Sequence, residues 1–194
     1  MRVFRNIFSQ LHTFILWLLM SVIFWGWIFT LITDTNRNRK VTVFVDVPEL
    51  EERELAVKLE EELPKGLKMI KVHTFDYDII GTGALAKGDV YIARESQLRS
   101  MLEQAPDCMA ELPLPEGCTG YTVGGKNYGI LIYDAKTRSG SGTAYIPYWY
   151  GEETENYYLC INADSPHLEA RKGAVDNAAW EVALHLLQLG PDRP

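Results

Sequence analysis

Two aspartates separated by a single residue, Asp76 and Asp78, are the first side chains of this sequence whose types and spacing suit chemistry. Paired carboxylates can divide the roles of general acid and general base in hydrolysis, and Asp89 is a further carboxylate in the same stretch of chain. In a loop that follows a strand, however, aspartates are more often solvated turn residues. The sequence therefore favours a protein without catalytic activity, and a membrane-anchored hydrolase that uses these loop carboxylates is the alternative.

Two further groups contain residue types that catalysis or metal binding requires. Asp164, Ser165 and His167 are the three residue types of a catalytic triad, but residues so close together in one loop rarely place a base against a nucleophile. Turn and helix-capping roles are expected for Asp164 and Ser165. Glu181 and His185 are four residues apart on an expected helix, and a surface pair is favoured because the HExxH pattern is absent. We predict no metal and no cofactor.

Three cysteines follow the N-terminal part of the chain. Cys108 and Cys118 bracket a proline-rich loop, and in an oxidising compartment they would close a small disulfide. Whether they pair depends on which side of a membrane the chain occupies. Cys160 belongs to an apolar strand and is expected to be a buried residue.

An aromatic cluster at residues 145–150 contains Tyr145, Tyr148, Trp149 and Tyr150. Aromatic rings in a loop suit stacking on a sugar or peptide, and Tyr and Trp are enriched at protein interfaces. The same rings can also cover the core or lie near a membrane surface. Tyr148 and Trp149 are the members predicted to bind a ligand.

One unbroken apolar stretch, residues 11–33, precedes all of these groups, and residues 13–33 contain no charged side chain. At about 1.5 Å per residue, a helix of this length matches the hydrocarbon thickness of a bilayer. The stretch is longer than the core of a cleaved signal peptide, and no Ala-x-Ala pattern follows it. We therefore predict a tail at residues 1–10, a transmembrane helix at residues 11–33 that contacts the bilayer, and a linker at residues 34–40.

The orientation of this helix is less well defined by the sequence. Arg2 and Arg5 precede it, and Arg37, Arg39 and Lys40 follow it, so the basic residues nearly balance. A short N-terminal tail followed at once by an apolar segment is typical of a signal anchor. We expect a single-pass protein of the cell membrane whose C-terminal domain is extracytoplasmic.

Residues 41–190 are sufficient for one domain with a substantial core. All 26 acidic residues and 17 of the 19 basic residues follow the apolar stretch, because only Arg2 and Arg5 precede it. Nucleic-acid binding requires clustered basic residues, so this acidic composition argues against a nucleic-acid partner.

Alternation, apolar spacing and turn residues predict the elements of this domain. They are a strand at 41–47, a helix at 48–63, strands at 67–75 and 89–93, a helix at 95–104, a hairpin at 121–133, a strand at 157–162 and a helix at 176–189. This order predicts an α/β fold: one three-layer lobe with a mixed, mainly parallel sheet.

Four segments carry a resemblance to a known family: residues 41–47, 88–93, 121–130 and 157–167. Together they resemble one lobe of a bacterial extracellular solute-binding protein of the periplasmic type II kind. The 121–130 segment is similar to the glycine-lysine-x-tyrosine-glycine hairpin of that family. The chain has residues for one lobe only, so the resemblance implies a half-site rather than two lobes that close on a ligand.

In α/β sheets such a half-site lies in the loops at the carboxyl ends of the parallel strands. The residues expected there are Asp46, Asp76, Tyr77, Asp78 and Arg94. The sequence therefore predicts a non-catalytic, membrane-anchored binding module. Its partner would be a small solute or a protein in the same membrane.

Overall fold

The computed structural model describes residues 2–33, 36–75, 87–148, 155–168 and 173–190. Its contacts divide the chain into two compact units, Met1–Asn36 and Arg37–Pro194. Four residues of the predicted ligand site, Asp76, Tyr77, Asp78 and Trp149, lie outside the described residues.

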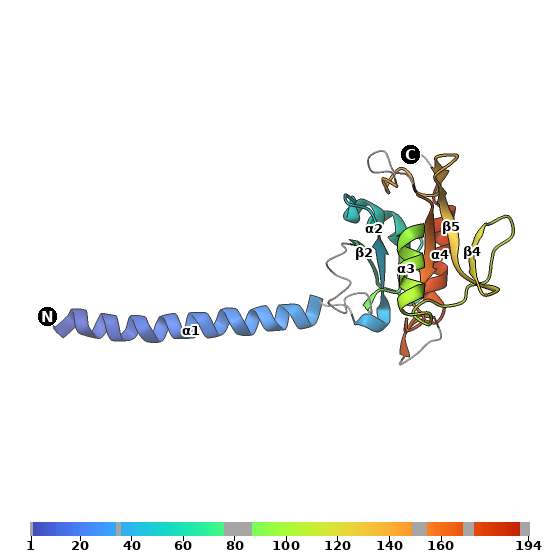
Figure 1. Ribbon diagram of the computed structural model, residues 1–194. Coiled ribbons are helices and arrows are strands. Elements are labelled where there is room, and N and C mark those ends of the chain that lie inside the picture. The colour runs from blue at the N-terminus through green and yellow to red at the C-terminus, as the bar shows by residue number, and fades with distance from the viewer. Residues whose placement is uncertain (1, 34–35, 76–86, 149–154, 169–172, 191–194) are drawn as a thin grey trace. The chain divides into compact units, whose positions relative to one another are not determined.

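The first unit is a single helix, α1 (Arg2–Thr33), drawn in blue in Figure 1. Its Leu11–Phe29 window has a mean hydropathy of 1.8, and none of that window is buried. Among the described helices, α1 alone is long and apolar enough to cross a membrane, a property that a signal sequence shares. Residues 2–10, the predicted tail, belong to the same helix, since no Gly or Pro interrupts them.

The second unit contains a curled, seven-stranded mixed sheet in the order β2-β1-β3-β7-β5-β4, with β6 paired to β5. The strands are β1 (Lys40–Val45), β2 (Met69–Thr74), β3 (Val90–Arg94), β4 (Gly120–Val123), β5 (Lys126–Asp134), β6 (Ser139–Gly140) and β7 (Tyr157–Ile161). Each strand predicted from the sequence is present, and Gly124 and Gly125, both with positive φ, form the turn of the β4–β5 hairpin. The prediction of a mixed α/β fold is confirmed.

The prediction of a mainly parallel sheet is wrong. Only the pairs β1–β2 and β1–β3 are parallel, and the pairs that involve β4, β5, β6 and β7 are antiparallel. The cause lies in the second half of the domain, where β4 and β5 form a hairpin and β7 inserts between β3 and β5. Register shifts at Tyr121/Thr122 and Leu131/Tyr133 interrupt the regular pairing on β5.

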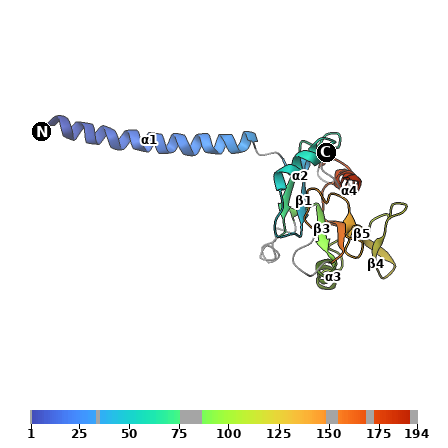
Figure 2. The same cartoon turned by 90° about the horizontal axis from the view of Figure 1, so that it is seen from above.

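Helices cover both faces of the sheet. They are α2 (Glu52–Glu60), α3 (Glu95–Gln104) and α4 (Ala178–Gln188). Alternate residues of β1 point to opposite faces, so Val43 and Val45 join the core beneath α2 and α4 whereas Phe44 joins the core beneath α3. Figure 2 shows α2 and α4 on one side of the strands and α3 on the other.

The edge strand β2 is protected by acidic side chains of α2. The amide of Ile70 donates to Glu60 Oε1 at 3.0 Å, and the amide of Thr74 donates to Glu52 Oε1 at 2.8 Å. Unpaired amides on an edge strand can recruit another strand, and these two carboxylates occupy them. Two glutamates of the acidic helix therefore have a structural role.

Candidate functional site

The structure brings Asp46 and Arg94 together at the carboxyl ends of β1 and β3. Asp46 directly follows β1, Arg94 is the last residue of β3, and the two strands are parallel neighbours. Arg94 Nε donates to Asp46 Oδ2 at 2.9 Å, and Arg94 Nη2 donates to Asp46 Oδ1 at 3.1 Å. The two residues that the sequence places at one strand-end site thus form a bidentate ion pair.

This pair cross-links the two strands. The side chain of Asp46 is 6% exposed and that of Arg94 is 41% exposed, and the Arg94 amide also donates to Asp46 Oδ2 at 3.3 Å. Hydrogen bonding to Asp46 is the main cause that raises the pKa of Arg94. Tyr157 lies close by, and burial followed by the negative charge of Asp46 raises its pKa to about 12. Asp46 is therefore engaged within the protein, and only Arg94 has a substantial exposed surface.

Replacing Asp46 with alanine is expected to lower the free energy of unfolding by about 2 kcal/mol, because hydrogen bonds to charged groups contribute about 1.5–3 kcal/mol and solvent screens the exposed part of Arg94. Thermal unfolding of the full chain in detergent, followed by circular dichroism, measures the change. Glu61→Ala is the matched control, since Glu61 pairs with Lys58 on the exposed surface at 2.6 Å. Equal losses for the two variants would contradict a structural role for Asp46.

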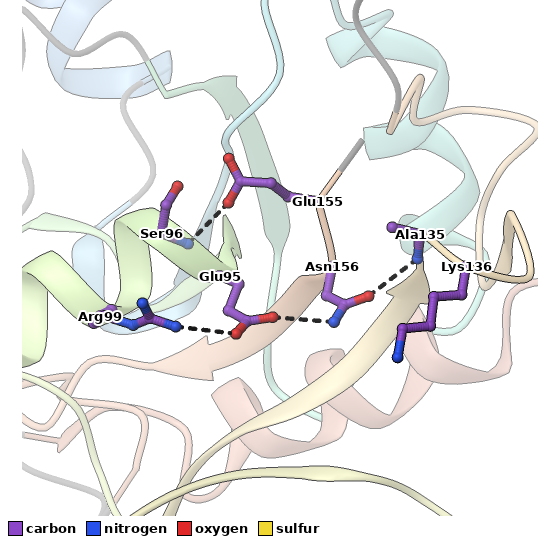
Figure 3. Close-up of a pocket in the computed structure, with 7 residues that line it drawn as sticks. All are labelled: Glu95, Ser96, Arg99, Ala135, Lys136, Glu155 and Asn156. Atoms are coloured by element: carbon purple, nitrogen blue, oxygen red, sulfur yellow. Dashed lines mark hydrogen bonds and ion pairs between the residues drawn. The ribbon is translucent and has the colours of Figure 1, made fainter. Parts of the chain in front are cut away.

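A pocket of about 370 Å³ lies beside this ion pair, at the start of α3 (Figure 3). We call it the strand-end pocket, and its lining residues are Glu95, Ser96, Arg99, Ala135, Lys136, Glu155 and Asn156. Three elements supply them: the first turn of α3, the turn after β5 and the residues before β7. The pocket contains side chains of both charges.

Most of the polar groups in the strand-end pocket bond to one another. Glu95 accepts from Arg99 Nη2 at 3.2 Å and from Asn156 Nδ2 at 3.0 Å, and Asn156 Oδ1 accepts from the Ala135 amide at 3.1 Å. The first amides of α3 are also occupied: Glu95 N donates to the Asn156 carbonyl and Ser96 N donates to Glu155 Oε2. Figure 3 shows this row of contacts, with Arg99 at one end and Lys136 at the other.

Lys136 is the exception within the strand-end pocket. Its backbone amide donates to Asp134 Oδ1 at 2.8 Å, but its Nζ forms no ion pair with any residue in the described parts of the chain. An exposed ammonium at the mouth of a polar pocket is a ready contact for an anionic group.

Comparison of the chain with known protein families, curated proteins and solved structures finds no match. The resemblance to one lobe of a solute-binding protein therefore stays a prediction.

Tyr148 is a core residue, which corrects the expectation that its ring stacks on a ligand. It is 1% exposed, its ring stacks on Tyr133 with centroids 4.7 Å apart, and its hydroxyl donates to the Ser141 carbonyl at 2.8 Å. Tyr157 packs edge-on against the same ring. Aromatic composition suits a core and a ligand site equally well, and here the core explains it.

Tyr145 lines a second pocket of about 320 Å³ that also lies after β1. Its other lining residues are Glu49, Leu50, Glu51, Thr143, Ala144 and Pro147. Of the aromatic cluster, Tyr145 is thus the described member that faces a pocket.

The predicted disulfide is absent from the structure, in which Cys108 and Cys118 are both free thiols. They pack against different cores: Cys108 against the core beneath α3, and Cys118 against the core beneath α2 and α4. Burial raises the pKa of the Cys108 thiol and, much more strongly, that of Cys160, which lies fully inside. Burial therefore disfavours the thiolate form at Cys108 and at Cys160.

Asp164, Ser165 and His167 do not form a catalytic triad. Ser165 Oγ donates to Asp89 Oδ1 at 2.7 Å, while both ring nitrogens of His167 face backbone carbonyls rather than Ser165. His185 lies 4.0 Å from Glu62, and no group of three or more metal-binding side chains occurs among the residues that the structure describes.

Sequence reasoning missed the buried partners of Asp89. Asp89 Oδ2 accepts from the Thr42 amide at 2.8 Å, and Ser165 on the other oxygen is 76 residues away in sequence. The one local signal was an aspartate at the start of an otherwise apolar strand. A buried carboxylate needs donors, but their identity depends on contacts between distant parts of the chain.

Proposed function

We propose that this chain is a membrane-tethered, extracytoplasmic binding domain that holds a small polar solute at the strand-end pocket without catalysing a reaction. In this proposal the domain resembles a single lobe of a solute-binding protein. The bound solute carries at least one anionic group, which Lys136 contacts. A protein in the same membrane receives or senses the bound state.

The observation that carries this proposal is the strand-end pocket itself. Ligands of α/β sheets bind beyond the carboxyl ends of parallel strands, and the pocket lies beside the end of β3. Its network of Glu95, Arg99 and Asn156 is already bonded, which favours a preformed polar site. Lys136 adds a cation that no described residue neutralises.

Two further observations support the tether and the absence of catalysis. The Leu11–Phe29 window of α1 is apolar and unburied, as expected for a helix that lies in lipid. Asp89, one of the carboxylates on which the alternative hydrolase depends, is 1% exposed and engaged by Thr42 and Ser165. Asp89 therefore does not reach a substrate, which removes one of the three carboxylates proposed for the alternative hydrolase, whereas Asp76 and Asp78 lie outside the described residues.

Thermal shift of the full chain in detergent tests the binding proposal, with small carboxylates, phosphate esters, amino acids and neutral sugars as probes. An anionic or zwitterionic probe is expected to raise the unfolding temperature in a concentration-dependent way. Lys136→Ala is expected to lower the affinity for that probe by about fivefold, because an exposed ion pair contributes up to about 1 kcal/mol.

The matched control is Lys71→Ala, which removes an exposed lysine from β2, far along the sheet order from the pocket. This control should leave the affinity unchanged. If no probe shifts the unfolding temperature and a membrane protein co-purifies with the chain, the solute proposal fails in favour of a protein partner.

A further inference from the structure

His167 is fully buried, and each of its ring nitrogens faces a backbone carbonyl of the described chain. Nδ1 lies 3.1 Å from the Val175 oxygen, and Nε2 lies 3.0 Å from both the Arg37 and the Lys40 oxygens. Its exposed fraction is 0%. The ring therefore occupies a site in which each nitrogen meets an acceptor.

Carbonyl oxygens accept hydrogen bonds and cannot donate them. A neutral imidazole has one N–H and one lone pair, so either neutral tautomer would direct a lone pair at a carbonyl oxygen about 3 Å away. Only the imidazolium has N–H groups on both nitrogens. The geometry thus selects the cationic form of His167.

A buried cation needs a counter-charge, and Asp89 supplies it. Ser165 connects the two residues: its hydroxyl donates to Asp89 Oδ1 at 2.7 Å and accepts from the His167 amide at 3.2 Å. Burial raises the pKa of Asp89, and the positive charges of His167 and Arg37 act against that rise. Arg37, whose carbonyl accepts from the ring, thus also adds its positive charge to this cluster.

The contacts of His167 fasten the beginning of the domain. Residues 37–40, which we call the joining segment, follow α1 and lead into β1. Val175 N donates to the Asn38 carbonyl at 3.3 Å, and Lys68 N donates to the Arg39 carbonyl at 2.8 Å. The side chain of His167 thus bonds two carbonyls of this segment and also the carbonyl of Val175, which lies 135 or more residues later in the chain than the segment.

We propose that His167 is a buried imidazolium latch that holds the joining segment against the part of the chain around Val175. The latch is independent of the solute proposed for the strand-end pocket.

The test uses the full chain in detergent, labelled with ¹⁵N in its histidines. Long-range ¹H–¹⁵N spectra at neutral pH should show a proton on both ring nitrogens of His167. The signals are assigned by their disappearance in His167→Gln. A single neutral tautomer in the folded protein would overturn the proposal. If His167→Gln does not fold, variants of His12, His73 and His185 assign the other signals, and those of His167 follow by elimination.

Hydrogen exchange followed by mass spectrometry tests whether His167 holds the joining segment in place. At one pH, His167→Gln is expected to speed exchange of the amides just after the joining segment by about tenfold or more, because the bonds of a charged donor are lost there. His185→Gln, on α4, is the matched control and should leave these amides unchanged. Unchanged exchange in a folded His167→Gln protein would overturn the latch.

Discussion

Replacing Asp89 with alanine is expected to lower the free energy of unfolding by about 3 to 5 kcal/mol, the usual loss when one partner of a buried charge pair is removed. The reason is local. The Thr42 amide and the Ser165 hydroxyl would both lose their acceptor inside the protein, and His167 would lose its counter-charge. Such a loss is a large fraction of the stability of an ordinary domain, about 5–15 kcal/mol. Thermal unfolding of the full chain in detergent measures it.

Two control variants separate the causes of this loss. Asp89→Asn keeps an oxygen for the Thr42 amide and has an NH₂ group that can donate to Ser165 Oγ, so it removes the charge and keeps both contacts, with the direction of the Ser165 bond reversed. Asp164→Ala removes an exposed aspartate from the turn that contains Ser165, and it should leave the free energy of unfolding almost unchanged. If Asp89→Ala were as stable as Asp164→Ala, Asp89 would not support the buried network.

The difference in stability between wild type and Asp89→Asn is expected to depend on pH, and the direction of this dependence can be derived. Burial is the largest cause that raises the pKa of Asp89 above its ordinary value of 3.8. The folded state therefore holds this proton more tightly than the unfolded state does. The resulting contribution to stability is complete below the ordinary value and is lost as the pH rises through the folded-state pKa. Wild type should lose stability relative to Asp89→Asn over that interval, and a difference that grows in the opposite direction would contradict this sign.

Placing two arginines in α1, at Leu19 and Val22, is expected to move the chain out of the membrane fraction. Both residues lie in the exposed, apolar window of the helix. An arginine near the centre of a membrane helix costs about 2.5–3.5 kcal/mol on insertion, and two of them offset most of what an apolar stretch of this length contributes. Membrane fractionation after alkaline extraction measures the shift, and Leu19→Ile with Val22→Ile is the control that keeps the helix apolar.

Two readouts on the unchanged chain complete the test of the anchor. Intact mass distinguishes an anchor from a cleaved signal sequence, because an anchor leaves the full 22.1 kDa chain. Protease treatment of intact cells that express the chain with a tag after Pro194 then reports its orientation. We expect the tag to be digested, and a protected tag would place the domain in the cytoplasm and exclude an extracytoplasmic binding role.

The sequence alone was sufficient for features that neighbouring residues determine. The apolar helix follows from the absence of charge over a long stretch, and β1 follows from its run of β-branched residues. The β4–β5 hairpin follows from Gly124 and Gly125, whose positive φ suits glycine. The proximity of Asp46 and Arg94 could also be predicted from the sequence, because both residues lie at the ends of strands that were expected to be parallel.

Only the tertiary structure decided the features that depend on distant partners. Nothing within residues 157–161 specifies that β7 lies antiparallel between β3 and β5, so the sheet was expected to be more parallel than it is. The same limit explains Tyr148, which belongs to the core because Tyr133 and Tyr157 pack on it. Asp89 and His167 are the strongest cases. Each of them has polar contacts with groups 47 to 130 residues away in the chain, and no local pattern encodes which donor or carbonyl will lie there.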